Sequence, residues 1–214
     1  MCNLYSMTSN TQAIRDLFAI AAPALPNIPL LDAIFPGYDA PVVRQASGGT
    51  RELVMMHWGF VLPQQDKAPK DVTNARQDRV RASRFWSESF EQRRCLVPAT
   101  SFAEPKGKRP AIWHWFALVG DTPRPLFAFA GLWRRWRGMY RGEVREMETF
   151  AILTTTPNSL VATVHPSRMP VILAPENYSL WLSGRSDDAI ALAVPFPAEA
   201  MQIASRGDKK DPGL

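Results

Sequence analysis

The feature of this sequence that most constrains its fold is the spacing of its apolar segments, which are short and separated by turn-forming residues. Segments rich in β-branched and aromatic residues and bounded by Pro, Gly or charged turns are typical of strands. Most of the connections are too short to hold a crossover helix, so successive strands are expected to pair antiparallel. The expected strands are residues 42–45, 51–61, 95–98, 111–119, 126–133 and 150–155.

Helical spacing is clearest near the start of the chain. Ile14, Leu17 and Phe18 recur at helical intervals behind capping residues, which predicts an amphipathic helix over residues 11–21. The helix is expected to end at Pro23, because proline cannot continue it.

Other segments predict short helices and loops. An Arg-rich segment at residues 80–90 predicts a helix with one basic face, and residues 157–164 and 175–182 predict short helices with proline near the first turn. Residues 23–41 contain five prolines and predict an extended loop, and residues 62–73 predict a polar surface loop.

The composition indicates one domain. The chain has 214 residues, of which 46% are hydrophobic and 21% are charged, and this content supplies one sizeable core without requiring a second. We therefore expect one domain over residues 1–214, with a loosely held polar tail at residues 206–214.

Charge and residue content indicate which partners, which cellular compartment and which cofactors to expect. Lys and Arg total 25 against 20 Asp and Glu, and the resulting charge of +5 suits a polyanionic partner without requiring one. The only cysteines, Cys2 and Cys95, form no disulfide framework, so a reducing cytoplasm is expected. No secretion signal and no apolar run of membrane-spanning length is present, so no membrane partner is expected. The three histidines have no metal-ligand spacing, so neither a metal nor another cofactor is expected.

The second residue carries the most distinctive chemistry. Met1 is usually removed when a small residue follows it, and Cys2 would then carry an α-amine and a thiol on adjacent carbons. The amine can condense with an aldehyde to a Schiff base, and the thiol can close on the same carbon to give a thiazolidine. An α-amine with a pKa of about 7.7–8.0 is partly unprotonated at neutral pH. The alternative is that Cys2 is incidental, since terminal residues are often poorly ordered.

Asn74-Ala75-Arg76 is a second candidate. The amide of Asn74 can hold a polar intermediate, and the guanidinium of Arg76 can contact a phosphate through two hydrogen bonds. The alternative is that Asn74 caps a helix.

Two residues are candidates for proton transfer. Glu104 follows an apolar segment, a setting that can raise the pKa of a carboxyl group, although it can also pair with Lys106 or Lys108 on a turn. His165 borders a loop before an apolar strand, where an imidazole can transfer protons near neutral pH.

Some residues of the same types are expected to be structural. Cys95, His57 and His114 lie within apolar, strand-like segments, where a buried core side chain is the default. The basic stretch 134–141 can either extend a nucleic-acid surface or form the solvated tip of a hairpin.

Short motifs follow one another along nearly the whole chain. They are Cys2-Asn3, Trp58-Gly59-Phe60, Asn74-Ala75-Arg76, Arg94-Cys95-Leu96-Val97-Pro98 followed by Phe102 and Glu104, Phe129-Ala130-Gly131-Leu132-Trp133, Ile152-Leu153-Thr154-Thr155, and His165 with Arg168-Met169-Pro170-Val171-Ile172-Leu173. In this order they resemble the SOS response-associated peptidase family, which includes proteins that crosslink to abasic sites in single-stranded DNA.

The resemblance implies an α+β domain with a strongly curved, barrel-like, mostly antiparallel sheet, short peripheral helices and a basic groove for single-stranded DNA. In that family an exposed N-terminal cysteine forms a stable thiazolidine with the aldehyde of the ring-opened deoxyribose. Carried over, Cys2 is the nucleophile and Asn74 holds the amino terminus and the adduct. Glu104 orients the amine or relays its proton, and His165 acts as acid and base in sugar ring opening.

The resemblance also implies the partner. Arg76 and Arg168 are expected to contact the phosphates beside the lesion, and Asn3, Pro36 and Trp58 complete the expected DNA-binding residues. The expected partner is single-stranded DNA that contains abasic sites. The protein is expected to act as a monomer in the cytoplasm, associated with the nucleoid. The autoproteolysis credited to the family would here mean only the loss of Met1.

Two other functions fit parts of this pattern. One is a cysteine peptidase, acting on itself or in trans, with Cys2 as nucleophile and His165 as base, or an enzyme with lyase-like chemistry. The other is a non-catalytic binder of single-stranded DNA, whose affinity would fall steeply with salt.

Overall fold

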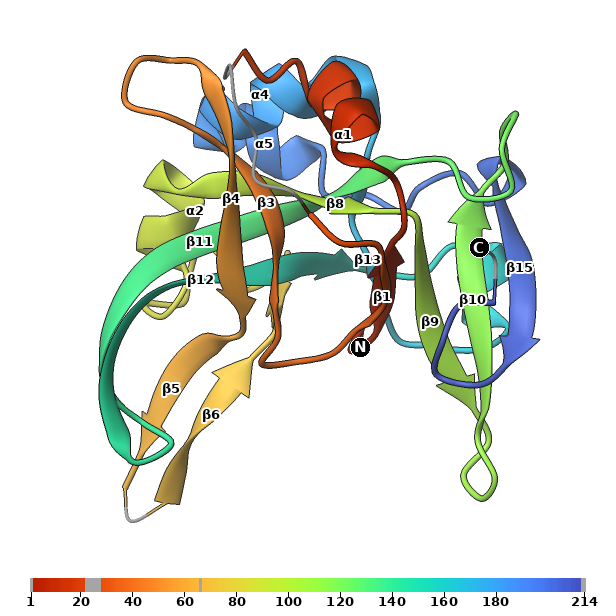
Figure 1. The fold of residues 1–214 in the computed structure, drawn as a ribbon, viewed down its shortest axis with the longest axis horizontal. Helices are drawn as coiled ribbons and strands as arrows, with labels where there is room; N and C mark the ends of the chain where they lie inside the picture. Colours follow the sequence, from red (N-terminus) through yellow and green to blue (C-terminus); the bar gives the residue numbers. More distant parts are fainter. Residues whose placement is uncertain (1, 22–27, 66, 213–214) are drawn as a thin grey trace.

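A computed structural model describes residues 2–21, 28–65 and 67–212. It shows an α+β domain in which short helices lie outside strongly curved, mostly antiparallel sheets (Figure 1). In chain order the elements are β1 (Tyr5–Met7), α1 (Thr11–Phe18), β2 (Leu31–Ile34), β3 (Asp39–Gln45), β4 (Arg51–Trp58), β5 (Phe60–Gln64), β6 (Lys67–Val72), β7 (Asn74–Arg76), α2 (Ser87–Gln92), β8 (Arg94–Ala99), β9 (Ser101–Lys106), β10 (Ile112–Leu118), β11 (Phe127–Tyr140), β12 (Glu143–Thr155), α3 (Ser159–Ala162), β13 (Met169–Pro170), β14 (Ile172–Leu173), η1 (Pro175–Asn177), α4 (Tyr178–Ser183), α5 (Ser186–Ala191), η2 (Ala198–Ala200) and β15 (Met201–Gly207).

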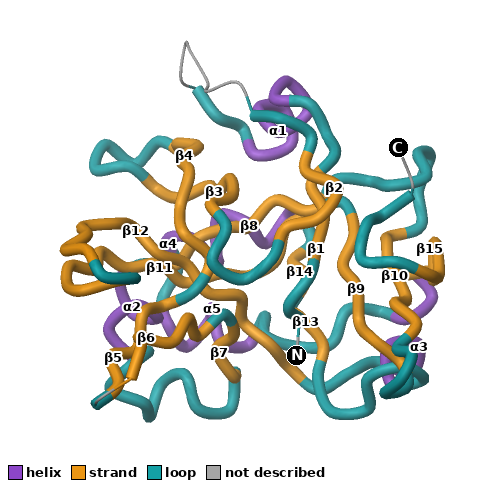
Figure 2. Tube along the Cα trace, turned by 60° about the horizontal axis from the view of Figure 1, so that its bottom comes forward, coloured by secondary structure: helices purple, strands orange, loops and turns teal. Residues whose placement is uncertain are grey.

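The main sheet closes into a barrel. Its strands pair in the order β12, β4, β3, β8 and β11, and β11 pairs again with β12. β11 and β12 continue beyond the barrel as one long curved hairpin (Figure 1), whose turn uses Arg141 and Gly142 at φ of 51° and 88°. A second sheet has the order β15, β10, β9, β1, β2, and β9, β10 and β15 lie on the opposite side of the molecule from the β11–β12 hairpin (Figure 2).

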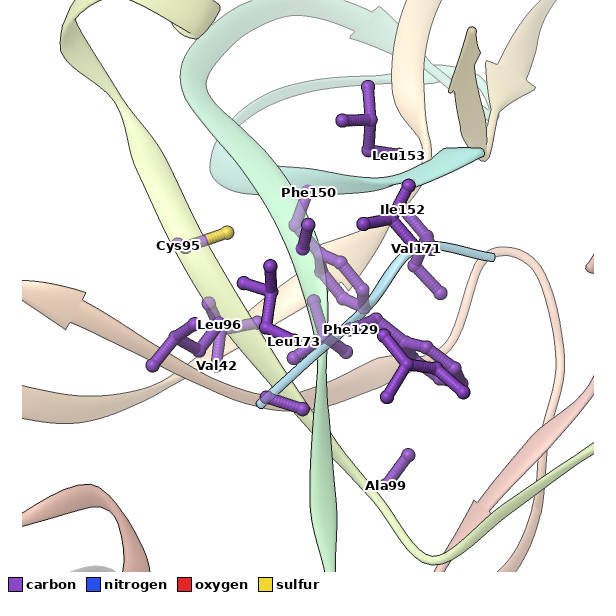
Figure 3. Packing of buried hydrophobic residues seen from close by; sticks show 14 of the residues in the cluster. Val42, Cys95, Leu96, Ala99, Phe129, Phe150, Ile152, Leu153, Val171 and Leu173 are labelled. Atoms are coloured by element: carbon purple, nitrogen blue, oxygen red, sulfur yellow. The ribbon is translucent and has the colours of Figure 1, made fainter. Parts of the chain in front are cut away.

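The apolar strand segments fill the barrel. Val42, Leu96, Phe129 and Phe150 come from four different strands and are fully buried (Figure 3). Burying one such side chain contributes about 1.5–3 kcal/mol, so this cluster supplies a large part of the stability of the fold. The core therefore explains why the apolar segments were identifiable as strands.

Most of the expected strands are present, with changed limits. Residues 42–45 and 51–61 lie in β3 and β4, which pair antiparallel, but the second segment breaks at Gly59. Gly59 has a φ of 141°, and a Cβ there would lie 2.5 Å from Cβ of Asp71, so only glycine fits. β12 departs from the antiparallel expectation, because it pairs in parallel with β4 and β7.

Three loop and helix predictions were wrong. Residues 62–73 are not a loop, because β5 and β6 pair as a hairpin through them. Residues 77–86 form turns, and the helix predicted at 80–90 is limited to α2; Phe85 and Trp86 instead pack their rings against Phe60. The proline-rich segment 23–41 contains β2 and the start of β3, and its residues 23–27 lie outside the described residues.

The helix predicted at residues 11–21 is present as α1, but it covers Thr11–Phe18 and ends before it reaches Pro23. The Asn10 side chain accepts a hydrogen bond from the Ala13 backbone nitrogen at 2.9 Å, and the helix ends at Ala19, whose φ is 50°.

The polar tail predicted to be loose is held at Asp211. This carboxylate is buried and accepts two hydrogen bonds from the Arg124 guanidinium, at 2.6 and 2.7 Å. The Asp211 backbone nitrogen also donates to the Asp32 carbonyl oxygen at 3.2 Å. A two-point Arg–carboxylate contact of this kind orders a segment that its composition alone predicts to be mobile.

Candidate active site

Strand β1 fixes the position of the chain's first residues. Tyr5 pairs with Phe102 of β9, and the Ala103 backbone nitrogen donates to the Leu4 carbonyl oxygen at 2.9 Å. Leu4 and Ala103 are fully buried together with Trp115 of β10. Because this pairing is antiparallel, residues 2 and 3 continue alongside the part of β9 that carries Glu104.

Cys2 is fully buried in the chain that carries Met1. Its Sγ lies 3.8 Å from the Leu4 carbonyl oxygen. Burial raises the pKa of the Cys2 thiol above its ordinary value, and the negative charge of Glu104 raises it further. In this state the thiol is therefore protonated and enclosed.

Asn74 contacts the residue that it was predicted to hold. It lies in β7, which pairs in parallel with β12 through Ile152, so it is not the helix cap offered as its structural alternative. Its Nδ2 donates to the Cys2 carbonyl oxygen at 2.9 Å and approaches Asn3 Oδ1 at 3.4 Å. Asn74 is 9% exposed, and among the described residues its Oδ1 has no hydrogen-bond partner.

Glu104 is buried on β9, and it does not lie on a turn as the surface-pair alternative required. Burial raises its pKa to about 7, and the positive charge of the amino terminus opposes this rise. A carboxyl group with this pKa can accept or donate a proton near neutral pH.

His165 lies in the loop between α3 and β13. Its Nδ1 is 3.0 Å from the Arg168 carbonyl oxygen and 3.2 Å from the Arg168 backbone nitrogen, so the backbone of this loop orients the ring. Burial lowers the pKa of His165, and the positive charge of the amino terminus lowers it further.

The two arginines predicted to bind phosphate differ. Arg76 has a side chain that is 46% exposed and donates to Asp78 through Nε and Nη2 at 3.0 and 2.6 Å. Arg168 is 11% exposed, and its guanidinium donates to Thr154 and Gln77. Arg168 therefore stabilises the loop that carries His165 in this structure, and its contact with a DNA phosphate stays a prediction.

Asn3 and Pro36 line a cavity of about 340 Å³ beside Asn74. Thr73 and Lys70 also line it, and the Thr73 hydroxyl donates to Asn3 Oδ1 at 3.2 Å. Neither Thr73 nor Lys70 was predicted to lie at the site, because residues 62–73 were interpreted as a surface loop. The signal that could have found Thr73 is its place immediately before Asn74.

Trp58, one of the expected DNA-binding residues, lies in the core in this structure, which is the alternative for a tryptophan inside a strand. Trp58 is fully buried, its ring meets Tyr5 edge to face at a centroid distance of 4.9 Å, and its Nε1 donates to the Thr73 carbonyl oxygen. The indole therefore belongs to the core beneath the cavity, and no base can stack on it.

The residues expected to be structural are buried in the fold. Cys95 is fully buried and is a free thiol, as is Cys2. His57 contacts Asp71 Oδ1 at 3.1 Å, and His114 Nδ1 lies 3.1 Å from the Ile112 carbonyl oxygen. Across the described ranges, no group of three His, Cys, Asp or Glu side chains could hold a metal ion. No helix in the part of the chain that the structure describes is long and apolar enough to cross a membrane.

Fold and site together define a mostly antiparallel α+β protein whose polar centre is assembled around a cysteine at position 2. Comparison with known families identifies the group: the chain belongs to the SOS response associated peptidase (SRAP) family, whose model matches residues 1–206.

Curated relatives agree with this assignment, and solved structures share the fold. Abasic site processing protein YoqW of Bacillus subtilis (strain 168) is 32% identical over 171 residues, covering 74% of this chain and 72% of the relative. Abasic site processing protein YobE of the same organism is 31% identical, covering 74% of each chain. A crystal structure of a protein from Bacteroides thetaiotaomicron has a TM-score of 0.75 at 22% identity, covering 99% of this chain and 97% of that one. A Bordetella bronchiseptica protein has a TM-score of 0.74 at 22% identity, covering 96% and 98%.

Proposed function

We propose that this chain, after removal of Met1, captures abasic sites in single-stranded DNA as a thiazolidine on Cys2. The observation that carries the proposal is the hydrogen bond from Asn74 Nδ2 to the Cys2 carbonyl oxygen, made beside a carboxyl group, Glu104, whose pKa is about 7. Relatives with about one third of their residues identical are named abasic site processing proteins. The protein acts as a cytoplasmic monomer and needs no cofactor.

The reaction balances without an oxidant or a metal. The unprotonated Cys2 amine adds to the aldehyde of the ring-opened deoxyribose, and loss of one water gives a Schiff base. The Cys2 thiol then adds to the same carbon, and its proton passes to the nitrogen. The net change is one carbon–nitrogen bond and one carbon–sulfur bond formed and one water released.

The neighbouring residues supply what this sequence of steps requires. Asn74 fixes the Cys2 backbone, so that the amine is presented in one orientation. Glu104 takes the proton from the ammonium group and returns it to the departing hydroxyl, for which a pKa of about 7 is well suited. His165, which a lowered pKa keeps neutral at pH 7, assists ring opening of the sugar as acid and base.

Removal of Met1 is a requirement of this chemistry. While Met1 is present, the Cys2 nitrogen is part of a peptide bond and cannot condense with an aldehyde. The Cys2 thiol is also fully buried in that form. The amine and the thiol of Cys2 are therefore both unavailable until the peptide bond between Met1 and Cys2 is cleaved.

Arg76 supplies the phosphate contact. Its guanidinium is exposed and is paired with Asp78, which is itself 43% exposed. Exchange of that carboxylate for a DNA phosphate costs little, because an exposed ion pair contributes only about 0–1 kcal/mol. Asn3 and Pro36, on the wall of the adjoining cavity, contact the nucleotides beside the lesion.

The peptidase alternative is less well supported. A cysteine protease requires a thiolate at neutral pH, usually produced by a nearby cation. In this chain burial and the Glu104 charge both raise the pKa of Cys2. A thiol of this kind suits the second, ring-closing step of a condensation better than direct attack on a peptide.

The test is incubation of the protein with single-stranded DNA carrying one abasic site, followed by denaturing electrophoresis. The wild-type chain should give a heat-stable shifted band, whereas Cys2→Ala should give none and should still bind DNA. Acetylation of the terminal amine should also remove the band. A band of equal intensity with Cys2→Ala would refute the proposal.

A further inference from the structure

A row of buried polar side chains connects β1, which carries the candidate nucleophile, with the segment that follows β15. Ser101 of β9 lies at its centre, and its Oγ donates to Asp211 Oδ2 at 2.5 Å. Ser6 Oγ of β1 lies 2.6 Å from the same Ser101 Oγ and 3.1 Å from Thr100 Oγ1. The three hydroxyl residues are fully buried, and Asp211 is 4% exposed, so these groups rely on one another for hydrogen bonds. Ser6, Ser101 and Asp211 together form what we call the serine–aspartate chain.

The carboxylate of Asp211 fixes the direction of these hydrogen bonds. It is paired with Arg124, whose Nη2 lies 2.6 Å from Asp211 Oδ1, so it accepts hydrogen bonds and donates none. Because Ser101 donates its single hydroxyl hydrogen to Asp211, Ser6 donates to Ser101. Thr100 then donates to Ser6. This order holds only while Ser6 stands opposite Ser101, since a shifted β1 would leave buried polar groups without partners.

The apolar side chains of β1 do not by themselves fix its register on β9. Leu4 packs in a small cluster with Ala103 and Trp115. Tyr5 and Met7 belong to the main core, and the pairing of β1 with β2 is irregular between these two residues. Both faces of β1 are thus covered by apolar groups, and a slip by one residue would bring no apolar side chain into water. A polar contact is therefore needed to distinguish the observed register from its neighbours.

The register of β1 determines where Cys2 lies. A strand rises about 3.3 Å per residue and successive side chains point to opposite faces, so a slip by one residue would move Cys2 by about that distance and turn its thiol away. The hydrogen bond from Asn74 Nδ2 to the Cys2 carbonyl oxygen, 2.9 Å long, would then be lost. The position of Cys2 relative to Glu104, which lies on β9 itself, would change as well.

The segment that carries Asp211 is anchored independently of β1. The Asp211 backbone nitrogen donates to the Asp32 carbonyl oxygen of β2 at 3.2 Å, and Lys210 Nζ lies 3.5 Å from Asp32 Oδ2. Trp115 Nε1 of β10 donates to the Asp208 carbonyl oxygen at 3.0 Å. In the sheet, β2 and β9 are the two neighbours of β1, and β10 lies beyond β9. Asp211 is therefore a fixed point against which the position of β1 is set.

We infer that the serine–aspartate chain sets the register of β1 on β9 and thereby places Cys2 beside Asn74. Its three members are positioning residues, because none of them lines the cavity beside Asn74. The inference rests on the proposed function for the reaction that Cys2 performs. The register itself can be measured without DNA.

The experiment compares Ser6→Ala, Ser101→Ala and the double variant with a control, Ser89→Ala, which removes the hydroxyl of a buried serine in α2. The rate of adduct formation is measured at saturating abasic single-stranded DNA, and the affinity for undamaged DNA is measured by fluorescence polarisation. Hydrogen exchange of the Ala103 amide, followed by NMR, reports on the register, because this amide donates to the Leu4 carbonyl oxygen at 2.9 Å. Urea denaturation gives the stability of each variant.

Ser101→Ala should slow adduct formation at saturating DNA by about tenfold or more, because small displacements of a reacting group lower the rate steeply. Its affinity for undamaged DNA should not change. The Ala103 amide should exchange about tenfold faster or more, because the pairing with β1 opens more often. Ser6→Ala should give similar losses, and the double variant should be no worse than Ser101→Ala, because both substitutions remove the same contact.

The control and a fourth variant complete the test. Ser89→Ala should change neither the rate of capture nor the exchange of the Ala103 amide, whereas folded Asp211→Ala protein should be as slow as Ser101→Ala. Equal rates for Ser101→Ala and Ser89→Ala would overturn the inference. Unchanged Ala103 exchange in Ser101→Ala, or additive losses in the double variant, would also overturn it. Absence of an adduct with wild type would refute the proposed function instead, and the Ala103 exchange would still decide whether the serine–aspartate chain sets the register.

Discussion

The surroundings of the two cysteines differ although both thiols are fully buried. Burial raises the pKa of Cys2 and of Cys95 alike. Around Cys95, in the barrel wall, the packing is so close that a Cβ on Gly131 would lie 2.8 Å from its Sγ (Figure 3). Around Cys2, by contrast, Asn74 and Glu104 bring an amide and a carboxyl group of raised pKa into the same buried region.

Burial and a raised thiol pKa are common to both cysteines, so neither property separates Cys2 from Cys95. Burial dominates the surroundings of Cys95 and the charge of Arg44 opposes its effect on the pKa, and in the described part of the chain no acid or amide hydrogen-bonds to the Cys95 thiol. Cys2 has both groups, and it is one peptide bond away from becoming an N-terminal residue. The proposed chemistry therefore depends on the polar neighbours of Cys2 and on its place at position 2, and each can be varied separately.

The largest expected effect separates the two thiols directly. Cys2→Ala should abolish crosslinking to abasic single-stranded DNA, because no sulfur remains to close the ring. Cys95→Ala should leave the yield within about twofold of wild type while lowering the free energy of unfolding by about 1–3 kcal/mol, as expected for a truncated core side chain. Gel quantification and urea denaturation measure the two outcomes. Loss of crosslinking in a folded Cys95→Ala protein would contradict the comparison.

His165→Ala should slow adduct formation by about 100-fold or more at pH 7, because general acid–base catalysis contributes factors of about 10²–10⁴. DNA affinity, measured with undamaged oligonucleotides, should stay close to wild type. In the wild-type protein the rate assigned to His165 as a base should rise as pH increases through its lowered pKa. An equal loss of rate and affinity would assign His165 a structural role.

The Glu104→Gln substitution tests the electrostatics around Cys2. The folded-state pKa of Glu104 is about 7 against an ordinary value of 4.5, so the folded protein holds the proton more tightly. The stability that this proton contributes is present below pH 4.5 and is lost as pH rises to about 7. At 1.36 kcal/mol per pKa unit, wild type should lose roughly 3 kcal/mol relative to Glu104→Gln across that range. Parallel stability curves of the two proteins would contradict the assigned pKa.

Asn74→Ala should have a smaller effect on capture. It leaves the buried Cys2 carbonyl oxygen without this donor, at a cost of about 1–3 kcal/mol, and should slow adduct formation roughly tenfold. Asn158→Ala is a matched control, because Asn158 caps α3 through Val161. It should lower stability to a similar extent without changing the rate of capture by the remaining folded protein. Equal effects of both variants on the rate would remove the specific role of Asn74.

Features that depend on residues close together in the sequence could be predicted, whereas features that depend on contacts between distant segments could not. The β8 and β11 segments were predictable because their apolar residues are local in the sequence. The family resemblance predicted Cys2, Asn74, Glu104 and His165 as a set of candidate site residues, and it also implied the curved antiparallel sheet. The structure now provides a direct contact for the Asn74–Cys2 pair.

The remaining features depend on contacts between distant segments. The parallel pairing of β7 with β12 and the burial of Asp211 by Arg124 join residues that are 78 and 87 positions apart, respectively. Arg168 belongs to a motif of the family, yet its guanidinium points inward because it donates a hydrogen bond to the Thr154 carbonyl oxygen. Sequence patterns do not reveal which way such a side chain turns, because the acceptor belongs to another strand.

The most direct test of the central claim is mass spectrometry of the tryptic peptides from wild-type protein that has reacted with abasic single-stranded DNA. The account predicts that the DNA remnant lies on peptide 2–15, which begins at Cys2 and lacks Met1, with the mass of both partners less one water. Peptide 95–106, which contains Cys95, should be unmodified. An adduct on peptide 95–106, or on a peptide that still carries Met1, would contradict the account.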